Sequence, residues 1–273
     1  MSGNGYPRVS TAWRWVIVSA VACLPAGWTP HAAGRAVACG DTIVADVRLE
    51  SDLVCAGSGL LVGADGIRVN LNGHAITGAG GGIGIDLAGR AGVSVIGGRV
   101  AGFFTGIRTL DASDIQIKGN RLEGNNDGVD LQIGSRLIAV KDNAFVNNAA
   151  RGIMVRSGTS DNEIKANTLT GNNIGILLFG TVGTAVKQNA LRENHLNGIR
   201  LGVLARDNLI AENAIASHPA GIELVAGAAG SSTGNRLLEN VLSMNGCGLK
   251  GPLAGNTVKE TTFHDNAVDV CGT

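Results

Sequence analysis

A phrase that recurs about every 23 residues constrains the fold of this chain more than any other feature. The segments "GNRLEGNNDGVDL" (119–131), "ANTLTGNNIGILL" (166–178) and "QNALRENHLNGIRL" (188–201) place asparagine and glycine at equivalent points. A glycine column and an asparagine column keep this period independently of one another. The columns are Gly84, Gly106, Gly128, Gly152, Gly175, Gly198, Gly221 and Gly248, and Asn120, Asn143, Asn167, Asn189, Asn213 and Asn240. Two residue types that share one period predict a repeat protein, in which each repeat is one structural unit.

Each repeat contains three short stretches in which apolar and polar residues alternate, such as "IQIK", "NRLEG" and "GVDL". This alternation is typical of half-buried strands, and the stretches are too short for useful helices. Three strands per repeat predict a triangular coil, and stacked coils place equivalent strands ~4.8 Å apart in three parallel sheets. The sequence therefore predicts an all-β, three-sheet solenoid of about eight to nine coils. The predicted inward columns contain Ile117, Val140, Ile164, Val186, Ile210 and Leu237, then Leu122, Phe145, Leu169, Leu191, Ile215 and Leu242, and then the aliphatic residue after each glycine.

The glycine and asparagine columns have different predicted roles. Glycine is expected where the chain turns tightly. Asparagine is expected to point its amide inward at a corner, where stacked amides hydrogen-bond one another and the backbone. The asparagine column is therefore predicted to be structural rather than ligand-binding.

Residues 1–38 contain the three regions of a secretory signal peptide. Arg8 and Arg14 precede the apolar run "WVIVSAVACLPAGW", and small residues follow in "HAAGRAVACG". Cleavage is predicted after Ala38, with Ala36 as a second position; an uncleaved anchor and a lipidated Cys39 are the other interpretations. The protein is therefore expected to be secreted or periplasmic, with no transmembrane segment in the mature chain.

The net charge of the predicted mature chain argues against one class of partner. Three of the 22 Lys and Arg residues and none of the 22 Asp and Glu residues precede position 39, which leaves 19 against 22, a net charge of −3. Nucleic-acid-binding proteins need a clearly basic surface, so no nucleic acid partner is expected.

The opening of the predicted mature chain carries a family resemblance. The segment "CGDTIVADVRLESDLVCAGSGLLVGADGIRVNLNGHAITG" (39–78) resembles secreted bacterial proteins related to NosD, a periplasmic accessory protein. These are right-handed parallel β-helix proteins of the pectin-lyase-like superfamily. The resemblance implies an N-terminal cap over 39–66 and a single-stranded right-handed parallel β-helix over 67–273. It implies the fold rather than one function, because this fold carries many activities.

Four cysteines follow the predicted cleavage site, an even number suited to an oxidising compartment. In a β-helix, Cys247 and Cys271 lie 24 residues apart, which is one coil, so they are expected to stack within disulfide distance. Cys39 and Cys55 are expected to staple the N-terminal cap. The alternative is that the cysteines are free or bind metal.

By the same resemblance, the "GIxL" stretch is the first sheet, which carries the active cleft in enzymes of the superfamily. Its predicted outward column is Asp86, Arg108, Asp130, Met154, Leu177, Arg200, Glu223 and Lys250, with Arg156 and Phe179 two residues further along. The candidate catalytic residues of a polysaccharide lyase, epimerase or glycoside hydrolase are Asp86, Arg108, Asp130, Arg200 and Glu223. Arg156 is a candidate for binding a uronate carboxylate, and calcium is a possible cofactor if the protein is a lyase. The alternative is a ladder of opposite charges that stabilises neighbouring strands.

A second outward column contains four stacked lysines, Lys118, Lys141, Lys165 and Lys187. Lysines ~4.8 Å apart repel one another unless something anionic lies along them, so they are a candidate track for an acidic polysaccharide or a lipid headgroup. The alternative is a solvated row neutralised by Asp142, Glu163 or Glu212.

Two histidines, His195 and His218, each fall three residues before a column glycine, so they are expected to face each other on adjacent coils. They are weak candidates for a metal site, and the NosD resemblance makes copper the metal to test. The alternative is that histidine takes over the hydrogen bonds of the asparagine found near this corner in most coils.

Two functions follow from these patterns. The first is a protein that binds, and in a stronger form cleaves or epimerises, an extracellular acidic polysaccharide. The second is a non-catalytic periplasmic or cell-surface scaffold related to NosD. The chain lacks the adjacent Asp-Asp pair of polygalacturonases and the "DPHD" motif of mannuronan epimerases, and residues 39–273 contain no tryptophan or tyrosine to stack on neutral sugars.

Overall fold

The computed structural model describes residues 36–228 and 230–272, which form three long parallel sheets and one short hairpin. The first sheet contains β1 (Thr42–Ile43), β4 (Leu60–Val62), β7 (Ile83–Asp86), β10 (Thr105–Thr109), β13 (Asp127–Leu131), β16 (Arg151–Val155), β19 (Ile174–Leu178), β22 (Asn197–Leu201), β25 (Ala220–Leu224), β30 (Cys247–Lys250) and β33 (Val268–Cys271). The second sheet contains β2 (Val47–Arg48), β5 (Arg68–Asn70), β8 (Ser94–Ile96), β11 (Gln116–Lys118), β14 (Ala139–Lys141), β17 (Glu163–Lys165), β20 (Ala185–Lys187), β23 (Leu209–Ala211), β28 (Arg236–Leu238) and β31 (Thr257–Lys259). The third sheet contains β3 (Leu53–Val54), β6 (Ala75–Thr77), β9 (Arg99–Ala101), β12 (Arg121–Glu123), β15 (Ala144–Val146), β18 (Thr168–Thr170), β21 (Ala190–Arg192), β24 (Ala214–Ala216), β29 (Val241–Ser243) and β32 (Thr262–His264). The antiparallel hairpin of β26 (Ala226–Gly227) and β27 (Gly230–Ser231) follows β25.

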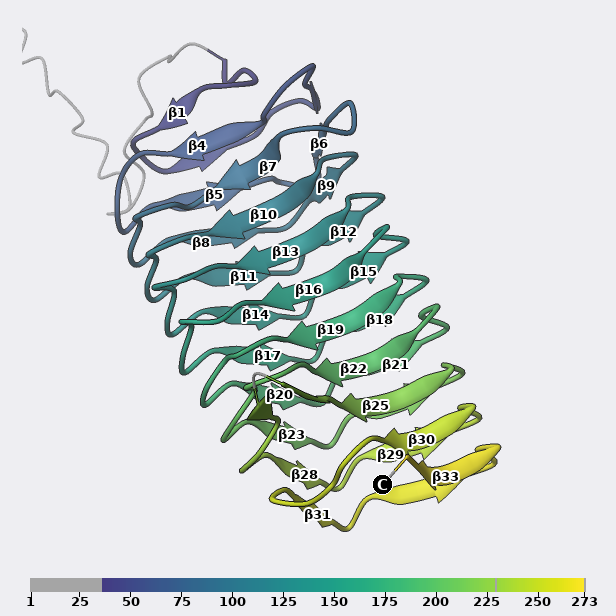
Figure 1. The fold of residues 1–273 in the computed structure, drawn as a ribbon. Helices are drawn as coiled ribbons and strands as arrows, with labels where there is room; N and C mark the ends of the chain where they lie inside the picture. Colours follow the sequence, from purple (N-terminus) through teal and green to yellow (C-terminus); the bar gives the residue numbers. More distant parts are fainter. Residues whose placement is uncertain (1–35, 229, 273) are drawn as a thin grey trace, which may run out of the picture. The chain divides into compact units, whose positions relative to one another are not determined.

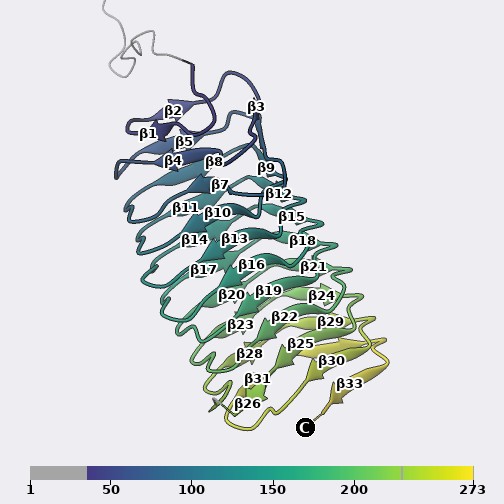
Figure 2. The ribbon, with the colours of Figure 1, turned by 45° about the horizontal axis from the view of Figure 1, so that its top comes forward.

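The chain passes through the three sheets in turn, and each circuit adds one strand to each sheet (Figures 1 and 2). The first sheet has 11 strands and the other two have 10 each, which makes ten complete coils followed by β33. The predicted all-β parallel β-helix is confirmed, and it has one or two coils more than the spacing suggested. The reason lies in residues 39–66, where β1, β2 and β3 already pair with β4, β5 and β6 of the next coil.

The core is a stack of aliphatic layers inside the coils. All the predicted inward columns are buried, as Ile117, Leu122 and Val129 illustrate within one coil. The only larger side chains among the fully buried residues of the described chain are Phe103 and Phe145. Burying each aliphatic side chain contributes about 1.5–3 kcal/mol, and every layer needs the coil on either side to achieve it.

The glycine column has a different physical cause from the predicted one. None of its eight members adopts the left-handed backbone conformation of a tight turn. A Cβ added at Gly128 would instead lie 2.6 Å from the carbonyl oxygen of Gly152 and 2.7 Å from the ring of Phe145. The same close approach, 2.5–2.7 Å to the next coil's carbonyl oxygen, recurs from Gly84 to Gly248. Glycine is therefore required because adjacent coils touch here, with no space for a side chain.

The predicted asparagine ladder is confirmed at the corner between the second and third sheets. The Asn143 side-chain amide donates to Asn167 Oδ1 at 3.0 Å and to the Ile117 carbonyl at 2.9 Å. The same Asn167 oxygen accepts from the Asn143 backbone N–H at 2.9 Å. Each amide thus satisfies buried backbone groups of two coils, and an apolar residue here would leave those groups without a partner.

Two further ladders are present, of which the sequence predicted only that asparagine recurs near the first corner and that histidine can replace it there. One, at the corner between the third and first sheets, contains Asn125, Asn148, Asn172, Asn194, His218, Asn245 and Asn266. A shorter one contains Asn208, Asn235 and Asn256. The doublets "NN" at 125–126, 147–148 and 172–173 were the sequence signal for the first of them.

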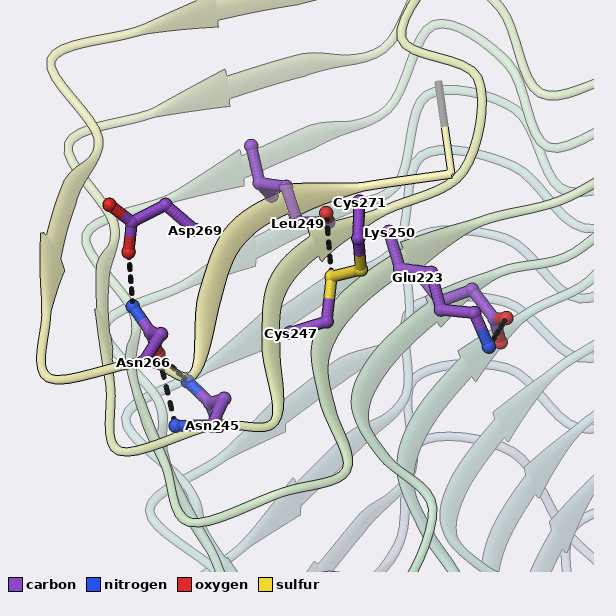
Figure 3. Close-up of a disulfide and its surroundings, with 8 residues drawn as sticks. All are labelled: Glu223, Asn245, Cys247, Leu249, Lys250, Asn266, Asp269 and Cys271. Atoms are coloured by element: carbon purple, nitrogen blue, oxygen red, sulfur yellow. Dashed lines mark hydrogen bonds and ion pairs between the residues drawn. A yellow bond between two sulfur atoms is a disulfide. The ribbon is translucent and has the colours of Figure 1, made fainter.

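Both predicted disulfides are present. Cys39–Cys55 joins the first coil to the residues before it, with 5.5 Å between the Cα atoms. Cys247–Cys271 joins β30 to β33, with 6.3 Å between the Cα atoms (Figure 3). The predicted signal peptide lies outside the described residues except for positions 36–38. No helix in the described part of the chain is long and apolar enough to cross a membrane.

Candidate functional site

The predicted outward column lies on one face of the first sheet. Asp86, Arg108 and Asp130 are in register on β7, β10 and β13, and Arg200, Glu223 and Lys250 are in register on β22, β25 and β30. Met154 and Leu177 lie between these two groups. The column therefore has charged ends and an apolar middle, as the sequence predicted.

At each end of the column, neighbouring charged side chains form ion pairs with one another. Arg108 donates to both carboxylate oxygens of Asp86, at 3.1 and 2.5 Å. Glu223 lies between Arg200 and Lys250, 3.1 Å from each cationic nitrogen. These contacts support the interpretation of both ends as a stabilising charge ladder.

Two buried carboxylates lie on β13, the strand that borders the apolar middle of the same face. Asp127 and Asp130 have side chains that are 1% and 2% exposed. Arg151 donates to both oxygens of Asp127 at 2.6 and 2.7 Å, and Arg156 donates to both oxygens of Asp130 at 2.8 and 3.0 Å. Such two-point pairs fix the plane of each guanidinium group and compensate the burial of each carboxylate.

Sequence reasoning missed Asp127 and Arg151. Strict alternation gives Asp127 the same direction as the buried Val129, so the sequence pattern offered no reason to place it on the outward face. The alternation is interrupted at Gly128, whose position faces the ring of Phe145 although Val129 beside it is also buried. The signal that could have revealed the pair is that Asp127 and Arg151 each directly precede a column glycine on adjacent coils.

A pocket of about 280 Å³ adjoins the Arg156–Asp130 pair. Gln132, Ile133, Arg156, Ser157 and Phe179 line it. Gln132 donates to Asp130 Oδ2 at 2.7 Å, and Arg156 is the one cationic side chain among the five lining residues. Hydrogen bonding to Asp130 raises the pKa of Arg156 above its usual value, so this donor stays charged at every physiological pH.

Phe179 supplies an exposed aromatic surface in this pocket. Its side chain is among the exposed large hydrophobic groups, at 43%. The ring packs on Gly202 of the next coil, because a Cβ added there would lie 3.0 Å from Phe179 Cδ2. The pocket thus combines a guanidinium group fixed by Asp130 with an aromatic ring that packs against Gly202.

The four lysines form the predicted column on the second sheet. Lys118, Lys141, Lys165 and Lys187 are in register on β11, β14, β17 and β20. Glu163 lies between Lys141 at 2.5 Å and Lys187 at 3.3 Å, and hydrogen bonding to Lys141 lowers the pKa of this carboxyl below its usual value. Lys118 is 3.6 Å from Asp142, whereas Lys165 has no ion pair among the described residues. Glu212, the third predicted counter-charge, accepts from Gln188 instead.

The two histidines do not face each other. His218 is buried in the ladder between Asn194 and Asn245, with ring contacts of 2.9 and 3.1 Å, whereas the side chain of His195 is exposed. Asn194 stacks on His218, and His195 does not. Three residues separate Asn194 from its column glycine, Gly198, whereas only two separate His218 from Gly221. The residues three positions before the two glycines are therefore not equivalent in the structure. Burial lowers the pKa of His218 to about 4, so the ring is neutral at physiological pH.

A family model described as periplasmic copper-binding protein (NosD) matches residues 64–266. The chain belongs to the NosD family. A search of curated proteins finds no match.

Solved structures show the same fold at low sequence identity. An alginate lyase from Paenibacillus sp. str. FPU-7 has 16% identity and a TM-score of 0.63, over 84% of this chain and 91% of that one. The periplasmic alginate epimerase AlgG has 17% identity and a TM-score of 0.59, over 83% and 73% of the two chains. The Dettilon tailspike protein has 14% identity and a TM-score of 0.56, over 84% and 57%. These neighbours establish the right-handed parallel β-helix fold.

The copper in the NosD family description can be tested against the donors that this chain offers. Copper binds thiolates, thioethers and imidazoles. Among residues 36–228 and 230–272, all four cysteines are in disulfides, and both ring nitrogens of His218 contact ladder asparagines. No group of three or more His, Cys, Asp or Glu side chains in these ranges is arranged to hold a metal ion. The four cysteines and His218 are therefore not free to act as copper ligands in these ranges.

Proposed function

We propose that this NosD-family protein binds an anionic, uronate-containing polysaccharide on the first-sheet face, with the pocket beside Arg156 as the centre of the site. The observation that carries this proposal is the geometry of Arg156. Asp130 fixes one edge of its guanidinium group, and Arg156 lines the pocket together with Phe179. A guanidinium that is already fixed can bind a carboxylate through its remaining N–H groups with little further loss of side-chain entropy.

The other walls of the pocket suit a sugar ring. Phe179 offers an apolar face against which a pyranose can pack, and Gln132 and Ser157 offer polar groups at its edge. The structural neighbours described as alginate epimerase and alginate lyase share this fold and support a polysaccharide as the ligand class. The proposal therefore combines one charged contact, one stacking contact and a few hydrogen bonds for the sugar residue that occupies the pocket.

The experiment is calorimetric titration of residues 39–273 with alginate and polygalacturonate oligomers, with a neutral glucan oligomer as the ligand control. Phe179→Ala leaves the Arg156–Asp130 pair intact, and we expect it to weaken binding about tenfold, equivalent to ~1.4 kcal/mol. Arg156→Ala should weaken binding at least as much. Arg108→Ala is the matched control, because it also breaks a two-point pair on this face but does not line the pocket. Equal binding by wild type, Phe179→Ala and Arg156→Ala would refute the pocket as the binding site.

Cleavage or epimerisation is the stronger form of this proposal. Its candidates remain Asp86, Arg108, Asp130, Arg200 and Glu223, each of which has an ion-pair partner on this face. A lyase would release unsaturated uronate that absorbs in the ultraviolet, and this can be followed with and without calcium. We expect binding without turnover, since a carboxylate held by an arginine at two points is poorly placed to accept a substrate proton.

The lysine column is an alternative surface for the same ligand. Lys165 has no ion pair within the described part of the chain, and the four lysines together exceed the charge of Asp142 and Glu163 beside them. Retention on an alginate column that falls with salt, and that is lost in Lys141→Ala/Lys165→Ala but kept in Phe179→Ala, would place the ligand on the second sheet instead.

A non-catalytic envelope scaffold is the second candidate function. The paired charges on the first sheet favour it, because they stabilise the stack without any ligand. Lack of binding across uronate, neutral and sulfated glycans would support this function against the first.

A further inference from the structure

The ion pair beside the pocket has a counterpart on the same two strands. Asp127 and Asp130 lie on β13, while Arg151 begins β16 and Arg156 directly follows its end. Each arginine donates to its aspartate through Nε and Nη2, so the two guanidinium groups are held in the same way. The arginine side chains are 25% and 41% exposed, whereas both carboxylates are buried. These four residues, here called the Asp–Arg tetrad, thus present two fixed cationic groups to solvent.

The stacking of coils does not account for the charges of the Asp–Arg tetrad. On the strands to either side, the residues in register with Asp127 and Arg151 are Thr105 and Ile174, which are uncharged and buried. The same fold is therefore built in neighbouring coils without a charge at this position. A buried ion pair is often no more stabilising than well-packed apolar side chains of similar volume. A binding role explains the tetrad better than a contribution to stability does.

The two cationic groups of the tetrad are separated along the strand direction. Asp127 and Asp130 are three residues apart on β13, so the guanidinium groups held against them lie roughly 10 Å apart, at ~3.3 Å per residue. Hydrogen bonding to Asp130 raises the pKa of Arg156, and the charge of Asp127 adds to this effect, so the two pairs act on one another. The pocket residues Gln132 and Phe179, which flank Arg156, are uncharged. A ligand that contacts both arginines therefore lies along β16, across the stack of coils.

The surface between the two arginines is uncharged. Met154 is the outward residue between them on β16, and it is only 4% exposed. On the next strand, Leu177 is in register with Met154 and is half-buried. Phe179 continues this apolar surface beside the pocket. A sugar chain along β16 can therefore place ring faces on Leu177 and Phe179 while its carboxylates reach the arginines.

We propose that Arg151 is a second carboxylate-binding residue, so that the site binds two carboxylates on different sugar residues of one polyuronate chain. This inference rests on the proposed function, because it takes the pocket beside Arg156 as the first of the two contacts. Each uronate carries one carboxylate, so the ligand is a run of uronate residues rather than an isolated uronate within a neutral polymer. A second contact by the same chain is intramolecular, and it adds affinity without a second loss of translational freedom. A run of uronates should therefore bind much more tightly than a single one.

The test is titration of residues 39–273 with galacturonate, followed by NMR, and with oligogalacturonates of increasing length, followed by calorimetry. We expect Asp127→Asn/Arg151→Gln to weaken binding of the longest oligomers at least tenfold, or ~1.4 kcal/mol, and to leave binding of the single sugar within about twofold of wild type. This double substitution leaves no carboxylate buried without a partner, and circular dichroism should show unchanged folding. Arg99→Gln/Glu123→Gln is the matched control, because it neutralises an ion pair on the third sheet and should leave both affinities unchanged.

A second variant keeps the test decisive if the first one does not fold. Arg151→Lys retains a charge beside Asp127 but cannot make the two-point contact, and it should also weaken binding of the long oligomers only. The inference is overturned if wild type binds long oligomers no more tightly than galacturonate, or if both Arg151 variants bind them as the control does. In either case, loss of binding in Arg156→Ala would leave the proposed function in place. If wild type binds no uronate of any length, the proposed function fails together with this inference.

Discussion

At the scale of single residues, His218 shows that an imidazole can take an asparagine's place in a buried ladder. The Asn194 amide contacts Nε2 at 2.9 Å, and Nδ1 contacts Asn245 Oδ1 at 3.1 Å. Because the amide nitrogen of Asn194 can only donate, Nε2 must accept, and the single ring proton must lie on Nδ1. Only the neutral ring satisfies both neighbours, and burial lowers its pKa to about 4 accordingly.

This arrangement predicts a pH-dependent stability that a single substitution removes. In the unfolded chain His218 takes up a proton near pH 6.5, but in the folded protein only near pH 4, so the free energy of unfolding falls as the pH drops through this window. The loss attributable to His218 is at most about 3 kcal/mol. His218→Asn restores the ladder residue, and urea unfolding at pH 7.5 and pH 4.5 should show that it gains stability relative to wild type at the lower pH. A constant difference between the two proteins at both pH values would contradict this role.

Sequence reasoning placed residues correctly where the repeat is regular, and it missed residues where the repeat is locally irregular. The lysine and first-sheet columns were predictable because strand pairing repeats the period, as Lys141↔Lys165 and Arg200↔Glu223 show. Asp127 was missed because the alternation breaks at a glycine, and His195 was misplaced because one turn is a residue shorter. Local insertions and bulges depend on three-dimensional packing, which periodicity alone does not encode.

At the scale of the strand, the glycine column sets how closely the coils can stack. A Cβ at Gly175 would lie 2.5 Å from the Gly198 carbonyl oxygen and 2.8 Å from Leu191 Cδ2, and neither the backbone nor the buried leucine has space to move. We expect Gly175→Ala to lower the free energy of unfolding by about 2 kcal/mol or more. Gly81→Ala is the control, because nothing lies within 4 Å of its added Cβ, and it should be neutral. Equal midpoints of urea unfolding for the two variants would mean that the coils can separate at little cost.

The sequence predicts the strands, but it does not predict why glycine recurs between adjacent coils. Alternation in "IQIK" or "NRLEG" marks an inward and an outward side, and the structure confirms these sides at Ile117 and Leu122. The sequence shows that glycine recurs, but it does not distinguish a turn from a close approach of two backbones, because both exclude a side chain. Only the position of the Gly152 carbonyl oxygen opposite Gly128 separates the two explanations.

At the scale of the whole described β-helix, stability is approximately a sum over coils and the contacts between neighbours. Ladders and inward columns make the middle coils nearly equivalent, so unfolding is expected to start where a coil has a neighbour on one side only. Both end coils of the described residues meet this condition, but the last one exposes the inward side chains of Val258 and Val270, so we expect unfolding to start there. The Cys247–Cys271 disulfide acts there, and it closes a chain segment with a sequence separation of 24.

Replacing both cysteines of this pair by serine should therefore destabilise one end rather than the whole β-helix. A disulfide that closes a loop of this length lowers the entropy of the unfolded state, which raises the free energy of unfolding by about 3 kcal/mol. This stabilisation is lost when the bond is removed. We expect hydrogen exchange to accelerate in β30 to β33, while amides in the middle strands, such as those of β13 and β16, keep their protection. If exchange accelerated equally along all three sheets, the coils would unfold as a single unit and the additive description would be wrong. If the last coil kept its protection, the Asn245–Asn266 contact and strand pairing would be sufficient to hold it without the disulfide.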